Sequence, residues 1–228
     1  MKESYDAATV QADFDRLASF STEQWDHNSH YHRFLLRHLP PHCRTALEIG
    51  CGTGAFARLL AQRSEHVLAL DLSPEMICLA KERSARYPTI EFQVADILSY
   101  EFSPGQFDVI VSIATLHHLP MEKLFVRLKE ALAPGGVLMA LDLYQPRLVD
   151  LPLNLIAVPA NLLLKYARTD HLKEPAAARA AWAEHGQRDV YLTIPQVRAL
   201  CQAVLPGARV KRHLFWRYSL VWKKSGSL

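Results

Sequence analysis

Hydrophobic and polar positions along this chain follow two alternating rhythms. Short, nearly continuous apolar runs, such as residues 107–114, are typical of strands that are covered on both faces. Between these runs, apolar residues recur every three or four positions, as they do in amphipathic helices. The pattern predicts an α/β fold, with a parallel sheet between two layers of helices and strands at about 45–50, 66–71, 89–95, 107–114 and 137–143.

The two ends of the chain depart from this alternation. Residues 5–39 predict two helices rich in aromatic residues and histidines, and we assign residues 1–43 to an N-terminal helical cap. The core, residues 44–143, is followed at 144–190 by a proline-punctuated and then alanine-rich segment. This segment predicts a helical insertion that either packs on the core or forms a mobile lid. Residues 191–228 complete the core with one helix and two antiparallel edge strands, at about 208–214 and 217–223.

The glycine-rich turn after the first strand is the most informative junction. Glycines allow a sharp turn and let a ligand approach the backbone, and the helix that follows offers unpaired N–H groups. Gly50, Gly52 and Ala55 fit the dinucleotide fingerprint, and Asp71 at the end of the second strand has the spacing of a ribose contact. Glu48 argues against NAD(P), because a carboxylate beside the loop disfavours a pyrophosphate and favours a cationic ligand.

Five motifs in this part of the chain resemble those of the class I S-adenosylmethionine-dependent methyltransferases. They occur in the family's order and cover about residues 44–143. The resemblance implies a Rossmann-like, doubly wound, seven-stranded and mostly parallel sheet with an antiparallel C-terminal hairpin. It also implies S-adenosylmethionine as cofactor and S-adenosylhomocysteine as its product. The motifs are Glu48 to Gly54, Leu70 to Ser73, Ala95 to Ile97, Phe107 to Leu119 and Leu132 to Leu138.

The same resemblance implies cofactor contacts for individual residues. Asp71 would accept both ribose hydroxyls, Asp96 would meet the adenine amino group, and the backbone N–H of Ile97 would meet the ring. Glu48 would assist the sulfonium and ammonium groups of the donor by electrostatics. The other cofactor-binding residues that we expect in these motifs are Gly50, Cys51, Gly52, Gly54, Leu72 and Ser112.

The N-terminal cap holds a dense cluster of aromatic and histidine residues. One hypothesis is a helix that closes over the cofactor, with Asn28 or Tyr31 touching its methionine end. The alternative is a helix that only packs on the core. His27, His30 and His32 do not predict a metal site, because only His27 and His30 would share a helical face and no cysteine joins them. We therefore expect no metal.

His117 and His118 are the candidate catalytic residues. They follow the fourth strand, where an acceptor would meet the sulfonium, and a neutral imidazole can accept a proton near pH 7. Histidines also pack at strand ends for structural reasons, so the base role is a hypothesis. Methyl transfer itself chiefly requires the nucleophile and the methyl group to be held about 3 Å apart and in line.

Several features limit the acceptor. The loop after the fourth strand lacks the Asp/Asn-Pro-Pro-Tyr motif of amino-group methylation in nucleic acids and glutamine, so a nucleic-acid acceptor is not expected. The insertion carries Trp182 and Tyr166, which suggests a small acceptor with an aromatic or aliphatic body and an O, N, C or S nucleophile. Two alternatives stay open: an NAD(P)-binding oxidoreductase, and a non-catalytic cofactor-binding partner subunit.

Composition fits these expectations. The net charge of +3 and the pI of about 8.7 are mild, and the four cysteines are too scattered to predict a disulfide framework or a zinc site. The acidic and polar N-terminus and the lack of any run of about twenty apolar residues predict a soluble, cytoplasmic protein without a membrane span. The sequence names neither the acceptor nor the oligomeric state.

Overall fold

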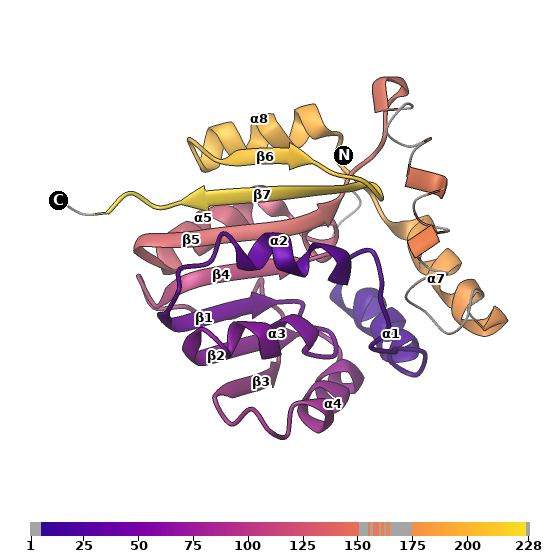
Figure 1. Ribbon diagram of the computed structural model, residues 1–228, viewed down its shortest axis with the longest axis horizontal. Helices are drawn as coiled ribbons and strands as arrows, with labels where there is room; N and C mark the ends of the chain where they lie inside the picture. The colour runs from indigo at the N-terminus through magenta and orange to yellow at the C-terminus, as the bar shows by residue number, and fades with distance from the viewer. Residues whose placement is uncertain are drawn as a thin grey trace.

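A seven-stranded sheet forms the centre of the molecule (Figure 1). The computed structural model describes residues 6–150, 155, 157–159, 161, 163–164 and 175–226. Neighbouring strands follow the order β3-β2-β1-β4-β5-β7-β6; the first five are parallel, and β7 is antiparallel to both β5 and β6. The predicted sheet is therefore confirmed. The strands are β1 Cys43–Ile49, β2 Ser64–Asp71, β3 Ile90–Val94, β4 Phe107–Ile113, β5 Leu132–Leu143, β6 Arg209–Arg212 and β7 Arg217–Lys223.

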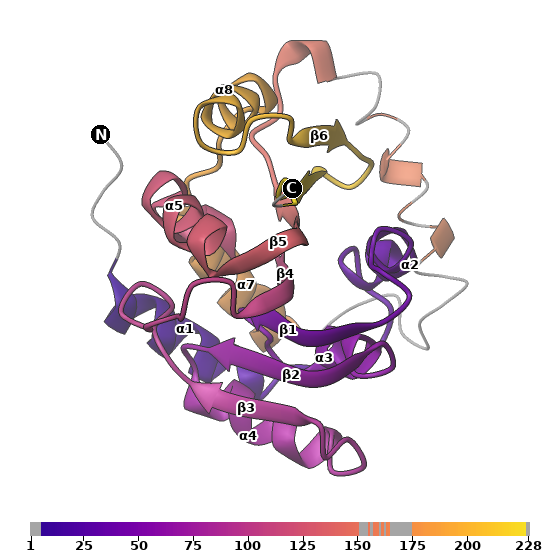
Figure 2. The same cartoon turned by 90° about the vertical axis from the view of Figure 1, so that its left-hand side faces the viewer.

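Helices cover both faces of this sheet (Figure 2). α2 (His32–Leu36), α3 (Ala55–Leu60) and α4 (Pro74–Arg83) pack on one face, whereas α5 (Met121–Ala131) and α8 (Ile194–Val204) pack on the other. β4 shows why its apolar run is continuous. Val109 and Val111 belong to the hydrophobic cluster of the first face and Ile110 to that of the second, so successive side chains are buried on opposite sides.

Two further helices lie at the carboxyl ends of the parallel strands. α1 (Ala7–Ala18) contacts both α4 and α7 (Ala176–Arg188), and Figure 1 shows α1 and α7 together at that edge. The predicted N-terminal helices are thus α1 and α2, with a short 3-10 turn at Ser29–Tyr31 leading into α2. None of the described helices is long and apolar enough to cross a membrane.

Two predicted features differ from the structure or lie outside it. β5 begins at Leu132, five residues before the predicted strand, because Pro134, Gly135 and Gly136 belong to the strand instead of separating it from the preceding helix. Gly135 N–H donates to the carbonyl of Lys224, and Lys224 N–H donates to the carbonyl of Gly136. Most of the apolar half of the predicted insertion, including Tyr166, lies outside the described residues.

Gly54 is a position where the turn before α3 needs glycine. Its φ is +76°, and a Cβ atom there would lie 2.9 Å from the ring of Phe92. Left-handed backbone is unfavourable for other L-residues, and the ring belongs to a buried side chain that cannot easily give way. The turn therefore packs directly against β3.

We expect Gly54→Ala to destabilise the protein by about 1 to 3 kcal/mol more than Gly207→Ala. The matched control Gly207 has a φ of +83°, and a Cβ atom there would meet nothing within 4 Å, so it isolates the backbone cost from the clash. Denaturant unfolding of both variants measures the difference. Equal losses would show that the contact with Phe92 does not constrain the turn.

Candidate active site

A cavity of about 740 Å³ opens at the carboxyl ends of the parallel strands. It is lined by residues from the β1, β2 and β3 loops on one side and from the β4 loop, α1 and α7 on the other. The predicted cofactor residues at its wall are Gly50, Gly52, Asp71, Leu72, Asp96 and Ile97. Asn28, His117 and His118 line the same cavity, so the fold brings together residues spread over about ninety positions of the chain.

Five predicted cofactor residues are not part of the cavity lining. Gly54 packs on Phe92, as described above, and Glu48 lies beneath the glycine turn. Cys51 and Ser112 are buried, and the Ser112 hydroxyl donates to the carbonyl of Ile49 at 3.1 Å, which joins β4 to β1. The Tyr31 hydroxyl donates to the carbonyl of Leu214 at 3.1 Å, so the structure puts Asn28 at the cavity and Tyr31 beside it in the core.

Asp71 combines two tasks at the end of β2. Its Oδ2 accepts a hydrogen bond from Gly52 N–H at 2.8 Å, and its Oδ1 accepts one from Ser73 N–H at 3.0 Å. Burial raises the pKa of this carboxyl, and these backbone donors oppose that shift. The side chain therefore holds the glycine turn in shape, while remaining lone pairs can accept from a ligand.

The two glycines at the cavity have different reasons to be glycine. A Cβ on Gly50 would overlap the side chain of Thr115, so this position is closed by the β4 loop. Gly52 has nothing within 4 Å, and its φ is +51°. Gly52 therefore leaves open space at the cavity wall, where a ligand can approach the backbone.

Glu48 is buried under the turn and does not reach the cavity. Its exposed fraction is 2%, and its Oε2 has no hydrogen-bond partner among the described residues. Burial, reinforced by the charge of Asp71, raises the pKa of Glu48 well above its ordinary value of 4.5. Burial favours the neutral acid, and the electrostatic role that we expect of Glu48 toward the cationic donor stays a prediction.

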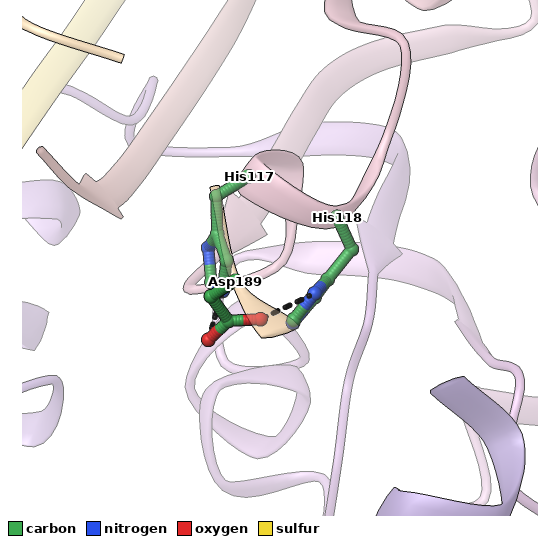
Figure 3. Close-up of side chains that lie close together, drawn as sticks. All are labelled: His117, His118 and Asp189. Carbon is green, nitrogen blue, oxygen red and sulfur yellow. Dashed lines mark ion pairs between the residues drawn. The ribbon is translucent and has the colours of Figure 1, made fainter. Parts of the chain in front are cut away.

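On the other side of the cavity, histidines and carboxylates form a connected cluster (Figure 3). His118 Nδ1 lies 3.2 Å from Asp189 Oδ1, and His117 Nε2 lies 3.7 Å from Asp189 Oδ2. The opposite nitrogen of His117, Nδ1, is 2.6 Å from Asp142 Oδ1 at the end of β5. His185 of α7 adds its Nε2 at 3.7 Å from Asp189 Oδ2. The β4 loop is thereby tied to β5 and to the end of α7.

The protonation of this cluster follows from its contacts. Burial alone would raise the pKa of Asp189, but hydrogen bonds from His118 and Tyr191 and the charge of His117 hold it at about 2. Burial lowers the pKa of His118 despite the contact with Asp189. A carboxylate only accepts hydrogen bonds, so Nδ1 of neutral His118 carries the hydrogen and Nε2 carries the lone pair. That buried Nε2 has no hydrogen-bond partner among the described residues.

His117, His118 and Asp189 are also spaced so that they could hold a metal ion. Their ligand atoms lie within 4.8 Å of one another, and no other such group occurs in the part of the chain that the structure describes. The N-terminal histidines do not form one; His27 instead stacks on Phe215 at 4.7 Å. The carboxylate of Asp189 already accepts from Tyr191 at 2.6 Å, and the absence of a metal stays our prediction.

Sequence reasoning missed the partners of the two histidines. Asp142 lies at the end of a buried strand, as Asp71 does, and that position was the available signal. His185 lies in the last turn of α7, and Asp189 and Tyr191 follow the end of that helix; no motif marks any of them. Arg217, at the start of β7, also lines the cavity, whereas the sequence placed it only in an edge strand.

Comparisons with known proteins agree with this architecture. A family model described as a methyltransferase domain matches residues 46–136. An uncharacterised methyltransferase of Mycobacterium tuberculosis is 29% identical over 202 residues, which are 88% of this chain and 98% of that protein. Trans-aconitate 2-methyltransferase of Deinococcus radiodurans is 33% identical over 168 residues, 71% of this chain and 64% of that protein.

A solved structure extends the agreement to the fold. The N-methyltransferase NodS of Bradyrhizobium japonicum, solved with S-adenosylhomocysteine, superimposes with a TM-score of 0.61 at 18% identity and covers 94% of this chain and 97% of that one. Together with the sheet order, these similarities show that the chain belongs to the class I S-adenosylmethionine-dependent methyltransferases. The family excludes the NAD(P) oxidoreductase alternative.

We expect Glu48→Gln to change the pH dependence of stability. A raised folded-state pKa means that the folded protein binds this proton more tightly than the unfolded chain, so the wild type loses stability as pH rises above about 4.5. The Glu48→Gln variant does not lose stability in this way, because the glutamine side chain does not titrate. The melting temperature of the variant should therefore gain on that of the wild type between about pH 5 and pH 8. Glu91→Gln, an exposed position on β3, is the control, and parallel curves would contradict a protonated Glu48.

Proposed function

We propose that this chain transfers the methyl group of S-adenosylmethionine to a small acceptor bound in the same cavity. The observation that carries the proposal is the cavity itself, which has the glycine turn, Asp71 and Asp96 on one side and the paired histidines on the other. The two sides meet at the β4 loop, where Thr115 packs on Gly50. Donor and acceptor would therefore face each other without a domain movement.

The donor half follows from charge and backbone geometry. Asp71 would accept the ribose hydroxyls, and Asp96, whose Oδ1 accepts from Leu98 N–H at 2.9 Å, would accept from the adenine amino group. Gly52 leaves room for the methionine portion. Four buried residues would shape the glycine turn from beneath: Cys51, Gly54, Ser112 and Glu48. Asn28 would contact the methionine end of the donor, and Tyr31 would support the N-terminal segment that carries Asn28.

The acceptor half is proposed to contain a general base. Transfer to a hydroxyl or an acidic carbon releases a proton, which neutral His118 can take on Nε2. Asp189 would hold the imidazole in the required tautomer, and the carboxylate would stabilise the imidazolium that forms. His117, fixed between Asp142 and Asp189, would position the pair.

The proposed acceptor is small and partly apolar. Aromatic side chains of Phe14, Phe20, Trp25 and Trp182 line the cavity beside the polar groups. Transfer to nucleic acid is not proposed, since the motif that holds a nucleobase amino group is missing from the β4 loop. Two relatives act by name on small molecules, trans-aconitate and phosphoethanolamine, which is consistent with this class of acceptor.

The donor half is tested by calorimetry. Wild-type protein should bind S-adenosylhomocysteine and not NADH, and Asp71→Asn should weaken S-adenosylhomocysteine binding about 10- to 100-fold, the cost of losing a charged hydrogen-bond acceptor. Glu122→Gln, which removes an exposed carboxylate on α5, should leave the affinity unchanged. No binding of S-adenosylhomocysteine by the wild type would refute the proposal and revive the non-catalytic partner.

The acceptor half is tested by turnover of a methyl acceptor. His118→Ala should lower kcat by about two to four orders of magnitude while S-adenosylmethionine affinity changes little, because a general base acts after the donor has bound. His117→Ala should also lower kcat with little change in S-adenosylmethionine affinity, but the decrease in kcat should be smaller. In the wild type, the acidic limb of the kcat profile should fall below pH 6.5, because burial lowers the pKa of His118 against the opposing contact with Asp189.

Two controls separate a base from other roles. His66→Ala removes an exposed histidine on β2 and should leave kcat unchanged. Dialysis against a chelator, followed by metal analysis, should leave kcat unchanged as well, because the histidines act here without a metal. Unchanged turnover in both His117→Ala and His118→Ala would remove the base role.

A further inference from the structure

Arg217 is a buried cation at the wall of the cavity. Its exposed fraction is 9%, and it is the one arginine or lysine among the described residues that line the cavity. Its Nε donates to Asn28 Oδ1 at 2.9 Å, and its Nη1 donates to the carbonyl of Phe215 at 3.1 Å. Both acceptors are uncharged. No carboxylate among the described residues forms an ion pair with it, in contrast to Arg212 on the neighbouring strand, which pairs with Asp150.

The positive charge of this buried guanidinium is not balanced by a paired carboxylate among the described residues. Burial of a guanidinium removes hydration that uncharged acceptors replace only in part. Burial lowers the pKa of Arg217, and the more distant charges of Asp142 and Asp26 offset only some of that shift. A guanidinium held by two fixed acceptors, one on Nε and one on Nη1, is oriented to receive an anion on its remaining N–H groups. The missing partner is thus an anion that enters the cavity.

The position of Arg217 in the sheet indicates which molecule brings the anion. The carboxyl edge carries, in spatial order, Asp96 after β3, Asp71 on β2, Gly50 after β1 and His118 after β4. Arg217 comes further along, on β7, where it pairs with Leu143 of β5. Asp96, Asp71 and Gly50 therefore lie on one side of the histidines and Arg217 on the other, about two strand spacings or on the order of 10 Å from β4. Asn28, the proposed contact to the methionine end, is the donor residue that touches Arg217.

The turn before Arg217 fixes its place. Phe215 and Trp216 both have positive φ, +58° and +55°, which is unfavourable for aromatic residues. Phe215 is fully buried and stacks on His27, so packing against the N-terminal segment holds the turn in this conformation. The same turn supplies the carbonyl that anchors Nη1. Arg217 is accordingly held rigidly at the cavity rather than free to extend into solvent.

We propose that Arg217 forms a binding site for an anionic group of the methyl acceptor, a carboxylate or a phosphate. The proposal rests on the proposed function and deepens it, since it names the acceptor class as a small organic anion. Such an acceptor has a nucleophilic atom near the histidines and its anionic group at Arg217, further along the sheet edge. Its apolar portion would contact the aromatic side chains that line the cavity.

The proposal is tested with probes that differ in charge and little in shape. Protein saturated with S-adenosylhomocysteine is titrated by calorimetry with benzoate, phenyl phosphate and neutral benzamide. The wild type should bind benzoate or phenyl phosphate about tenfold or more tightly than benzamide, and the tighter of the two identifies carboxylate or phosphate as the preferred group. Equal binding of all three, or binding of none, would overturn the proposal.

Variants then assign the preference to Arg217. Arg217→Gln should abolish the preference for the anions, Arg217→Lys should retain part of it, and Arg209→Gln, an exposed charge on β6, should leave it intact. An anion preference that survives in Arg217→Gln would show that a different residue binds the anionic group. Folding of each variant is checked by its retained affinity for 5′-methylthioadenosine, which occupies the nucleoside half of the donor site and lacks the amino-acid portion.

The methyl donor itself carries a carboxylate. A separate comparison therefore tests whether Arg217 binds the donor's carboxylate instead of the acceptor's anionic group. Arg217→Gln should bind S-adenosylhomocysteine within about threefold of the wild type, because Asp71 and Asp96, which would hold its nucleoside, lie on the other side of the histidines. A loss of tenfold or more for S-adenosylhomocysteine, with unchanged binding of 5′-methylthioadenosine, would assign Arg217 to the donor and overturn the acceptor site. Failure of the wild type to bind S-adenosylhomocysteine would instead refute the proposed function, so the two failures are distinguishable.

Discussion

The pairing of β1 with both β2 and β4 is the constraint on which the site depends. Glu48 of β1 stands opposite Ala69 and Val111 in these two parallel ladders, so all three strands end at nearly the same level. The residue after each strand end is then forced to the same edge of the sheet. The glycine turn, Asp71 and the histidine loop come together because their strands are parallel and in register, not because they attract one another.

Much of the cavity wall that is proposed to bind the donor could be predicted, because strand ends are visible in the sequence. An apolar run that stops at a glycine, as at Gly50, or at a carboxylate, as at Asp71, marks both the strand and the edge to which its loop belongs. The start of β5 was misjudged for a related reason. Pro134, Gly135 and Gly136 are typical of a turn that ends a helix, but here Gly135 and Gly136 pair with the backbone of Lys224, a partner almost ninety residues away.

The part of the cavity that is proposed to bind the acceptor could hardly be predicted from the sequence. Asp189 is placed by the path of α7, and Arg217 by a turn whose strained backbone is held by packing on His27. Neither residue has a local pattern, because their roles depend on contacts between distant segments. Glu48 illustrates the converse. Its presence before the turn was evident, whereas its protonation depends on burial and could not be read from the order of residues.

The antiparallel pairing of β7 with β5 determines where Arg217 lies along the sheet edge, independently of the strands that carry the glycine turn and Asp71. Arg217 of β7 pairs with Leu143 of β5 in that antiparallel ladder. Asp71 and Gly50, in contrast, lie at the ends of β2 and β1, on the far side of β4. A two-residue slip of β7 along β5 would keep every side chain on its own face and yet shift Arg217 by about 7 Å. With Arg217 in its proposed role, sliding one edge strand would therefore change the length of acceptor that fits, without moving Asp71, Asp96 or the glycine turn.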